Sequence, residues 1–302
     1  KIMKFKNLVL FEIEEMADLT KENLEARLSE RPLRECAEQE METFGWIPAI
    51  DEAYVEEIGD VLFIRAGIER KKLSRNAIKT AVEKHARDND LKIESRSEYK
   101  EIEEIVIDDM MRTAQAERYH VDAYIDLKKA WLVVDAASIK KASELTALLR
   151  KTIGSLPTSI LAPNVMLNAH MDNWVKSKIP STAIYLSDMV EMKELLKDEG
   201  GTARYKGIPA DSMEILDNLE NGWSVTRLGM VFQDAIGFNL TDDFLIKGIK
   251  YHGQYTEELS AKIGDESDVV AIKRSEAAFQ SLAFRALIDE LWRTIHGGGS
   301  IH

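Results

Sequence analysis

Alternating and helical patterns of apolar residues divide the first part of the chain into strands and a helix. The segments FKNLVLFEI (5–13), FGWIPAI (44–50) and DVLFIRAGI (60–68) are apolar or alternating over strand lengths. LTKENLEARLSE (19–30) instead repeats leucine at helical spacing, and Thr20 is a suitable N-cap. The pattern therefore predicts a strand, a helix and two further extended runs.

The same order of elements returns in the middle of the chain. AWLVVDAA (130–137) predicts a strand, SIKKASELTALLRKTI (138–153) a helix, and SILAP (159–163) a second strand. Gly154 suits a left-handed C-cap, and Pro157 follows where a helix cannot resume. Two strand–helix–strand passages of this kind favour an α+β centre built from two related halves.

A charged segment, residues 71–118, separates these two passages. Ser74 suits the N-cap of one helix, and Ser95 and Glu98 have the spacing of a capping box for a second. Residues 83–104 hold many charges and few large apolar side chains, so we expect a projecting helical hairpin with a thin core that meets another subunit. The apolar positions expected to share faces are Ile78 and Val82 in the first helix, and Ile102, Ile105 and Met110 in the second.

Two further capping boxes occur in the last third of the chain. Asp188 and Glu191 predict a helix over MVEMKELLKDE (189–199) that stops at Gly200. Asp211 and Glu214 have the same spacing. The second box predicts a helix over SMEILDNLE (212–220), which stops at Gly222.

The chain closes with strands and a long helix. WSVTRLGMVF (223–232), AIGFNL (235–240) and FLIKGIKY (244–251) are short alternating runs typical of antiparallel strands. SEAAFQSLAFRALIDELWRTI (275–295) is a helix with apolar residues around most of its circumference, so we expect it to be buried or to pack on a partner.

Together the patterns predict an α+β protein. It has a centre of two related strand–helix units, a helical hairpin over residues 71–118 that projects from it, and a last third of further helices and strands.

Composition excludes several protein classes. The 302 residues are 45% hydrophobic, enough for about two domains with cores. The net charge of -13 excludes a uniformly basic nucleic-acid binder, but a basic strip on an acidic body stays open because binding depends on local potential. Cys36 is the single cysteine, which excludes an internal disulfide and a multi-cysteine zinc site. We find no membrane-spanning run and no signal peptide, and expect a soluble, cytoplasmic protein.

The chain offers little that could carry catalysis. Its six histidines lack the i, i+4 partner of a helical zinc site, and His170-x-Asp172 is more often a packing feature. Neither G-x-S-x-G nor a P-loop is present. Acids gather in one segment, at Glu103, Glu104, Asp108 and Asp109. A two-metal nuclease needs converging acids, but this spacing fits a solvated helix face. We expect no enzyme, no metal site and no cofactor.

Cations are spread over separate predicted elements, as contact with a phosphate backbone requires. They are Lys128 and Lys129 before the strand 130–137, Lys140 and Lys141 at the start of the helix 138–153, Arg150 and Lys151 at its end, Arg70, Lys71, Lys72 and Arg75 at the base of the hairpin, and Arg204 and Lys206 after Gly200–Gly201. Each cluster alone fits a solvated surface. No zinc finger, RNP aromatic pair or long basic helix accompanies them, so nucleic acid would be bound with little sequence preference.

Several short stretches also occur in a collinear order. They are FKNLVLFEI (5–13), FGWIPAI (44–50), VVDAAS-KKA (133–142), ALLRKTIGSLP (147–157), NWV (173–175), LKDEGGTARYK (196–206), SVTRLGMVF (224–232) and ALIDELW (286–292). No single stretch is decisive, but together they run from about residue 3 to 292. In this order they resemble the bacterial RdgC family of recombination-associated proteins.

The resemblance implies a monomer in three parts: a discontinuous centre (residues 1–70 and 119–179), a protruding helical hairpin called the tip (71–118), and an α+β base (180–302). In that family two subunits join tip to tip and base to base in a closed ring, through which duplex DNA is thought to pass without sequence recognition. The family is associated with restraining RecA-type recombinase and with replication-fork repair. The resemblance thus implies a nucleoid-associated homodimer, and Arg150 and Lys151 are expected to face a DNA channel as well as the helix end.

The chain departs from the family pattern at two places. Gly207 and Ile208 stand where the family commonly carries lysine and glutamine, and AQAERYH (114–120) replaces an aromatic and basic pattern, with Arg118 and Tyr119 as the nearest substitutes. Two functions therefore stay open. One is non-specific binding of double-stranded DNA by a ring dimer. The other is an interaction protein on the same scaffold that contacts recombination proteins without binding DNA.

Overall fold

The structure, a computed structural model, describes residues 4–178, 180–195 and 200–297. Its strands are β1 (Asn7–Ile13), β2 (Glu42–Ile47), β3 (Val55–Ile58), β4 (Val61–Lys71), β5 (Ala116–Asp126), β6 (Trp131–Val134), β7 (Thr158–Ile160), β8 (Ile184–Glu194), β9 (Thr202–Lys206), β10 (Trp223–Phe232), β11 (Ile236–Thr241) and β12 (Ile246–Tyr251). Its helices are α1 (Lys21–Ser29), α2 (Arg75–Asp88), α3 (Arg96–Thr113), α4 (Ile139–Ile153), α5 (Leu167–Ser177), α6 (Met213–Glu220), α7 (Gly253–Ile263) and α8 (Val269–His296). The predicted α+β class is confirmed.

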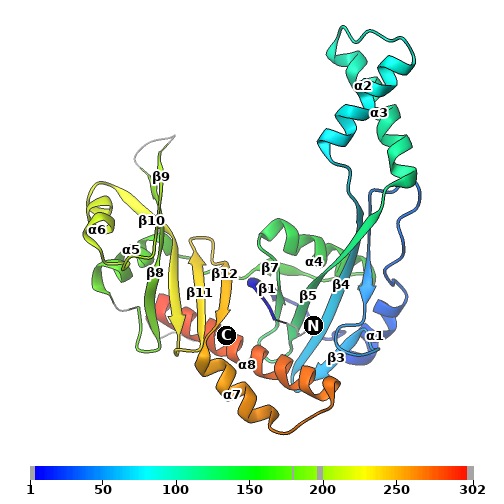
Figure 1. Cartoon of the computed structure of the whole chain (residues 1–302). Helices are drawn as coiled ribbons and strands as arrows, with labels where there is room; N and C mark the ends of the chain where they lie inside the picture. Colours follow the sequence, from blue (N-terminus) through cyan, green and yellow to red (C-terminus); the bar gives the residue numbers. More distant parts are fainter. Residues whose placement is uncertain (1–3, 179, 196–199, 298–302) are drawn as a thin grey trace.

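One antiparallel sheet runs through the whole body, in the order β2-β4-β5-β6-β1-β12-β11-β10-β8-β9 (Figure 1). We call the strands from β2 to β1 the centre half and those from β12 to β9 the base half. The two halves meet where β1 pairs with β12, through Asn7 opposite Lys247 and Leu8 opposite Ile246. Because the sheet is continuous, the domain boundaries inferred from the sequence stay a prediction.

The two faces of the sheet carry different helices. In the centre half, Val9 and Phe11 pack in one core with the buried residues of α1 and α4, and we call this side the α4 face. Leu8 and Tyr124 point to the other side, the α8 face, where they share a core with Phe284 of α8. In the base half, α5 and α6 also pack into this second core, and in Figure 1 they lie on the side away from the tip.

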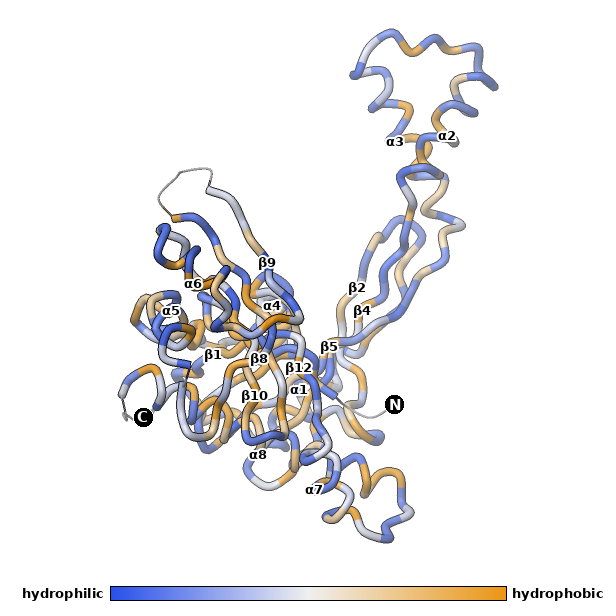
Figure 2. Tube along the Cα trace, turned by 60° about the vertical axis from the view of Figure 1, so that its left-hand side comes forward, coloured by the Kyte–Doolittle hydropathy of each residue, from blue (hydrophilic) through white to orange (hydrophobic). Residues whose placement is uncertain are grey.

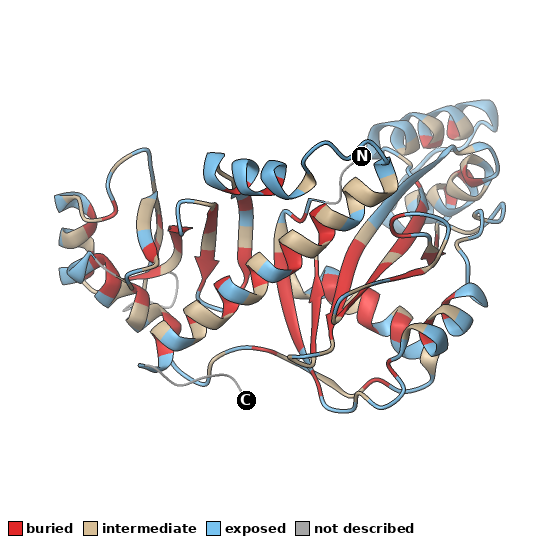
Figure 3. Cartoon of the chain, turned by 90° about the horizontal axis from the view of Figure 1, so that it is seen from below, coloured by how far each residue is buried: buried red, intermediate tan, exposed pale blue. Residues whose placement is uncertain are grey.

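The long helix α8 crosses both halves of the sheet (Figure 3). On the centre half, Arg285 of α8 donates to Asp126 at 2.6 Å and to Asp60 at 2.9 Å. On the base half, Trp292 lies edge-on to Phe244, with ring centroids 6.0 Å apart. The expected burial of this helix is confirmed for one side of it, and the side that Figure 3 shows has exposed positions.

The tip stands away from the body at the end of β4 and β5 (Figure 2). Both predicted N-caps form: Ser74 accepts from the N–H of Ala77 at 3.1 Å, and Ser95 and Glu98 exchange hydrogen bonds in a capping box. The tip core is thin and separate from the rest, with Val82, Ile102 and Val106 buried. The predicted common face is wrong at Ile105, since 51% of it is exposed and the next residue, Val106, turns inward instead.

The prediction of a helix over residues 189–199 is wrong for the part that the structure describes. This part belongs to β8, which pairs with β10 on one side and β9 on the other. Val190 and Met192 point into the core while Glu191 and Lys193 point outward, which is strand alternation. Residues 196–199 lie outside the described residues, and the carbonyl oxygen of Gly201 accepts a hydrogen bond from Glu194 N–H, next to the start of β9.

The helix predicted over 212–220 is confirmed as α6, but its expected cap does not form. Asp211 pairs with Lys178 at 2.6 Å, and no side chain caps α6. The predicted strands 223–232, 235–240 and 244–251 are confirmed as β10, β11 and β12. None of the described helices is long and apolar enough to cross a membrane.

Candidate nucleic-acid interface

Helix α4 presents four exposed cations on its outer side. Ser138 caps its first turn by accepting from the N–H of Lys141 at 3.3 Å, and Gly154 ends it with a φ of 91°. Because leucines and small residues of α4 are buried against the sheet, the remaining side of the helix faces solvent. The exposed cations are Lys140, Lys141, Arg150 and Lys151.

Two of these cations share a hollow with the stem of the tip. Lys140 and Lys141 line a cavity of about 600 Å³ together with Arg70 and Tyr119. The guanidinium of Arg70 lies 5.5 Å from the centre of the Tyr119 ring and forms an ion pair with Glu42. The structure therefore brings together cations from the base of the hairpin and the start of α4, which are far apart in the sequence.

Strand β9 carries the next pair of predicted cations. Arg204 binds Glu191 of β8 through two N–H groups, at 2.8 and 2.5 Å, although 60% of its side chain is exposed. Lys206 is exposed two residues further along the same strand face. Surface ion pairs of this type are weak, so Arg204 can exchange its carboxylate for another anion.

Lys71 has a structural position at the root of the tip. Its buried ammonium group donates to three carbonyl oxygens, of Ala37 at 2.8 Å, Glu38 at 2.7 Å and Met111 at 2.9 Å. An ammonium has three N–H donors, so none is left for a phosphate. Lys71 is therefore excluded from the candidate phosphate contacts.

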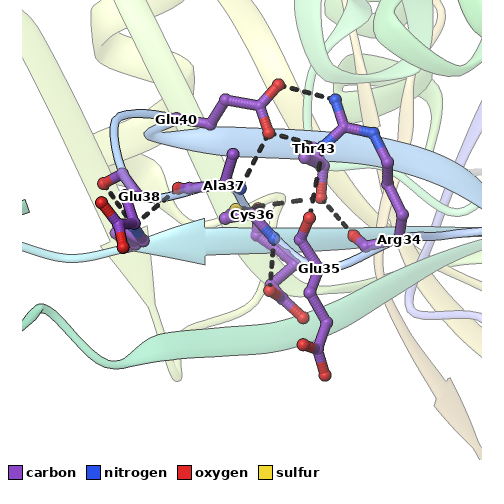
Figure 4. Close-up of polar contacts among 9 residues, drawn as sticks. Arg34, Glu35, Cys36, Ala37, Glu38, Glu40 and Thr43 are labelled. Carbon is purple, nitrogen blue, oxygen red and sulfur yellow. Dashed lines mark hydrogen bonds and ion pairs between the residues drawn. The ribbon is translucent and has the colours of Figure 1, made fainter. Parts of the chain in front are cut away.

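The loop that receives Lys71 is itself tied to the stem (Figure 4). The N–H of Cys36 donates to Glu69 at 2.8 Å, and Arg34 and Glu40 form a hydrogen-bonded ion pair that lowers the pKa of Glu40 to about 2. Arg118 pairs with the same Glu69. These bonds make the loop and the two long strands one unit.

The remaining hairpin cations are exposed. Lys72 lies 4.0 Å from Glu117, with both side chains largely in solvent, and Arg75 is the first residue of α2. Both positions are compatible with contact to a ligand passing the stem, and their role stays a prediction.

Lys128 and Lys129 lie apart from the α4 cations. They occupy the turn between β5 and β6, where Asp126 accepts from both of their backbone N–H groups. The ammonium of Lys129 donates to Asp289 of α8 at 2.8 Å and lies 5.4 Å from the centre of the Trp131 ring. This places Lys129 on the α8 face, on the other side of the sheet from α4.

The candidate His-x-Asp pair has a packing role. Asp172 accepts from the Ser224 hydroxyl at 2.8 Å and from the Val225 N–H at 2.7 Å, and burial raises its pKa. His170 lies against the Trp174 ring, 6.1 Å between centroids. Within the described ranges, no group of three or more His, Cys, Asp and Glu side chains is placed to hold a metal ion.

Two basic residues of the interface were missed by the sequence analysis. Arg227 of β10 and Lys250 of β12 share a hollow with Arg204 and Lys206. The signal was available, because strand alternation in 223–232 and 244–251 places both among residues that point away from the core. A search for runs of adjacent cations could not find single cations on neighbouring strands.

Comparison with known proteins gives one family. The family model described as "Putative exonuclease, RdgC" matches residues 3–298. The chain is 29% identical over 305 aligned positions to the recombination-associated protein RdgC of Pseudomonas putida KT2440, covering 98% of both chains. It is 31% identical to the protein of the same name from Proteus mirabilis HI4320, over 84% of this chain and 86% of the relative.

Proposed function

Because the chain belongs to the RdgC family of recombination-associated proteins, we propose that it binds double-stranded DNA through the phosphate backbone, without sequence preference. The observation that carries this proposal is the set of four exposed cations on the outer side of α4, in a chain whose net charge is -13. A local basic surface attracts DNA even on an acidic protein, because the Debye length is only about 8 Å at physiological salt.

The proposed contacts comprise the outer side of α4, the adjoining stem and β9. They are Lys140, Lys141, Arg150, Lys151, Arg70, Lys72, Arg75, Arg204 and Lys206. Arg118 points to the other side of β5, where it pairs with Glu69. Contacts to phosphate position a protein on DNA but do not read its bases, so we expect similar affinity for unrelated duplexes. Lys128 and Lys129 would belong to a second contact, since Lys129 lies on the α8 face.

The proposed assembly is a homodimer closed into a ring, with contacts at the tip and the base. The tip has exposed apolar residues beside its thin core, namely Leu91, Ile93 and Ile105. The base half exposes Met166 and Met213, of which 72% and 76% are accessible. Exposed apolar side chains in the tip and in the base half fit two separate subunit contacts. We propose that such a ring acts in the nucleoid, without catalysis, by limiting the access of a RecA-type recombinase to DNA.

A salt series on duplex binding tests the DNA-binding proposal. Replacing Lys140, Lys141, Arg150 and Lys151 by glutamine should weaken binding to all duplexes alike. The slope of log K against log salt should fall by about 0.9 for each phosphate that the variant no longer neutralises. K262Q/R293Q, on α7 and α8, is the matched control and should bind as the wild type does.

The alternative function predicts a different result. The acidic net charge and the pairing of Arg204 with Glu191 favour an interaction protein that has lost DNA binding. Absence of binding by the unaltered protein even at low salt would select this alternative. Incubation of linear and circular DNA with magnesium or manganese tests nuclease activity directly, and we expect no cleavage.

A further inference from the structure

A hollow of about 410 Å³ lies on the α4 face of the base half, where no described helix covers the middle of the sheet. Its lining residues come from all five base strands. The charged or titratable ones are Asp188, Arg204, Lys206, Arg227, Lys250 and His252. The hollow therefore has four permanent cations and one permanent anion in its lining.

Two glycines, Gly237 and Gly248, lie in the lining of this hollow. The ring of His252 lies over Gly237, where a Cβ atom would come within 2.6 Å of Nε2. Gly248 sits at an irregularity in the pairing of β11 and β12 with a φ of +61°, a conformation that other residues adopt only with strain. Gly237 therefore makes room for the imidazole that lines the hollow, and Gly248 leaves the β12 backbone without a side chain at its edge.

One donor in the hollow has no acceptor. The Nε atom of Arg227 is buried and makes no hydrogen bond with any described residue. Glu191 stands opposite Arg227 in the strand register, but its carboxylate is used by Arg204. An unpaired buried N–H leaves the charge of this guanidinium poorly compensated, so an anion in the hollow that accepts from its terminal N–H groups would be bound favourably.

The hollow is continuous with the surface that carries α4. Asn7, Val9 and Phe11 alternate onto one face of β1, and the latter two pack with the buried residues of α4 and α1. The side chain of Asn7 accepts from the N–H of Gly248, at the edge of the hollow, at 3.2 Å. A DNA duplex lying on α4 can therefore reach the hollow without crossing the sheet.

We propose that this hollow is a phosphodiester-binding subsite for duplex DNA, in which the guanidinium of Arg227 donates to a phosphate oxygen through its terminal N–H groups while Lys206 and Lys250 flank the strand. The proposal rests on the proposed DNA-binding function and adds a docking point that the exposed cations of α4 do not provide. A guanidinium offers phosphate two parallel N–H donors, whereas a lysine ammonium acts as a point charge. Arg227 is thus the residue that fixes where the backbone sits.

Fluorescence anisotropy with a labelled duplex tests the subsite. R227Q should lower affinity about tenfold, the effect of one charge-assisted hydrogen bond, and reduce the salt slope by about 0.9. R227K should restore the salt slope but recover only part of the affinity, since it keeps the charge and lacks the paired N–H donors of a guanidinium. K206Q/K250Q, at exposed positions where folding is not at risk, should lower affinity about tenfold as well.

R293Q is the matched control, because it removes one guanidinium on α8, on the other face of the sheet. Normal affinity of both R227Q and K206Q/K250Q, with weakened binding after replacement of the α4 cations, would overturn the subsite and leave the proposed function standing. Absence of DNA binding by the wild-type protein would overturn both the subsite and the proposed function. Full recovery by R227K would show that charge alone matters and that Arg227 does not dock a phosphate.

Discussion

Trp46 joins β2 to the last turn of α4 through one buried hydrogen bond, from Nε1 to the Thr152 hydroxyl at 2.9 Å. T152V keeps the shape of the side chain but leaves the indole N–H without a partner. We expect it to lower the free energy of unfolding by about 1–3 kcal/mol, measured by urea denaturation. In W46F/T152V neither partner is left unsatisfied, so the double variant should lose less than the sum of the single ones.

Asp135 makes stability depend on pH. Its carboxyl group accepts from the backbone N–H groups of Lys6 at 3.1 Å and Asn7 at 2.9 Å, yet burial raises its pKa from 3.8 to about 6. The charged form is therefore disfavoured by folding. The stability that the neutral carboxyl contributes is fully present below about pH 4 and is lost as pH rises through about 6.

D135N removes this charge while keeping an acceptor oxygen. We expect it to stabilise the protein by about 1–3 kcal/mol at pH 7.5 and to have little effect at pH 4. Urea unfolding at the two pH values measures the difference. An equal effect at both would mean that the carboxyl group is not the source of the pH dependence.

At the scale of elements, the tip offers a matched pair of substitutions in α3. Val106 belongs to the thin tip core, whereas 51% of Ile105 is exposed. I105K should leave the helical circular dichroism unchanged and weaken self-association through the tip. V106K should unfold the tip helices, because it places a charge in their core. Crosslinking between the tips of two subunits measures this contact, and unaltered tip-to-tip crosslinking of I105K would remove Ile105 from it.

The elements that the sequence predicted well are those whose signals are local. Ser74, Ser95 and Glu98 form caps where the spacing predicted them, and Gly154 ends α4 as expected. The pattern around Asp188 failed because pairing of β8 with β9 and β10 overrides a local capping signal.

The candidate interface was predictable only in part, for a related reason. Adjacent cations such as Lys140 and Lys141 are visible in the sequence, and the structure leaves them exposed. Lys71 belongs to a similar run of cations, but its ammonium group donates to three carbonyl oxygens. Strand alternation places Arg227 outside the core, but its grouping with Arg204, Lys206 and Lys250 appears only once their strands lie side by side. Burial and register, which depend on the whole sheet, decide these roles.

For the whole molecule, replacement of the tip tests the two proposed subunit contacts separately. Lys71 is paired with Ala116, so an Asn-Gly turn in place of residues 72–115 should preserve the β4–β5 hairpin. We expect light scattering to show a dimer joined by the base alone. It should dissociate from DNA faster than the wild type, because it cannot close around the duplex. A monomer would show that the base is not an interface.

The meeting of β1 with β12, crossed by α8, has a mechanical consequence. Two residue pairs join the strands of the two halves, and α8 spans this junction. Arg285 binds the centre half and Trp292 packs on the base half. A force on the tip is therefore transmitted through α8 to the base half, so each subunit moves as one rigid body. A ring of two such rigid subunits would open at the contacts between them, and a duplex without free ends would enter through that opening.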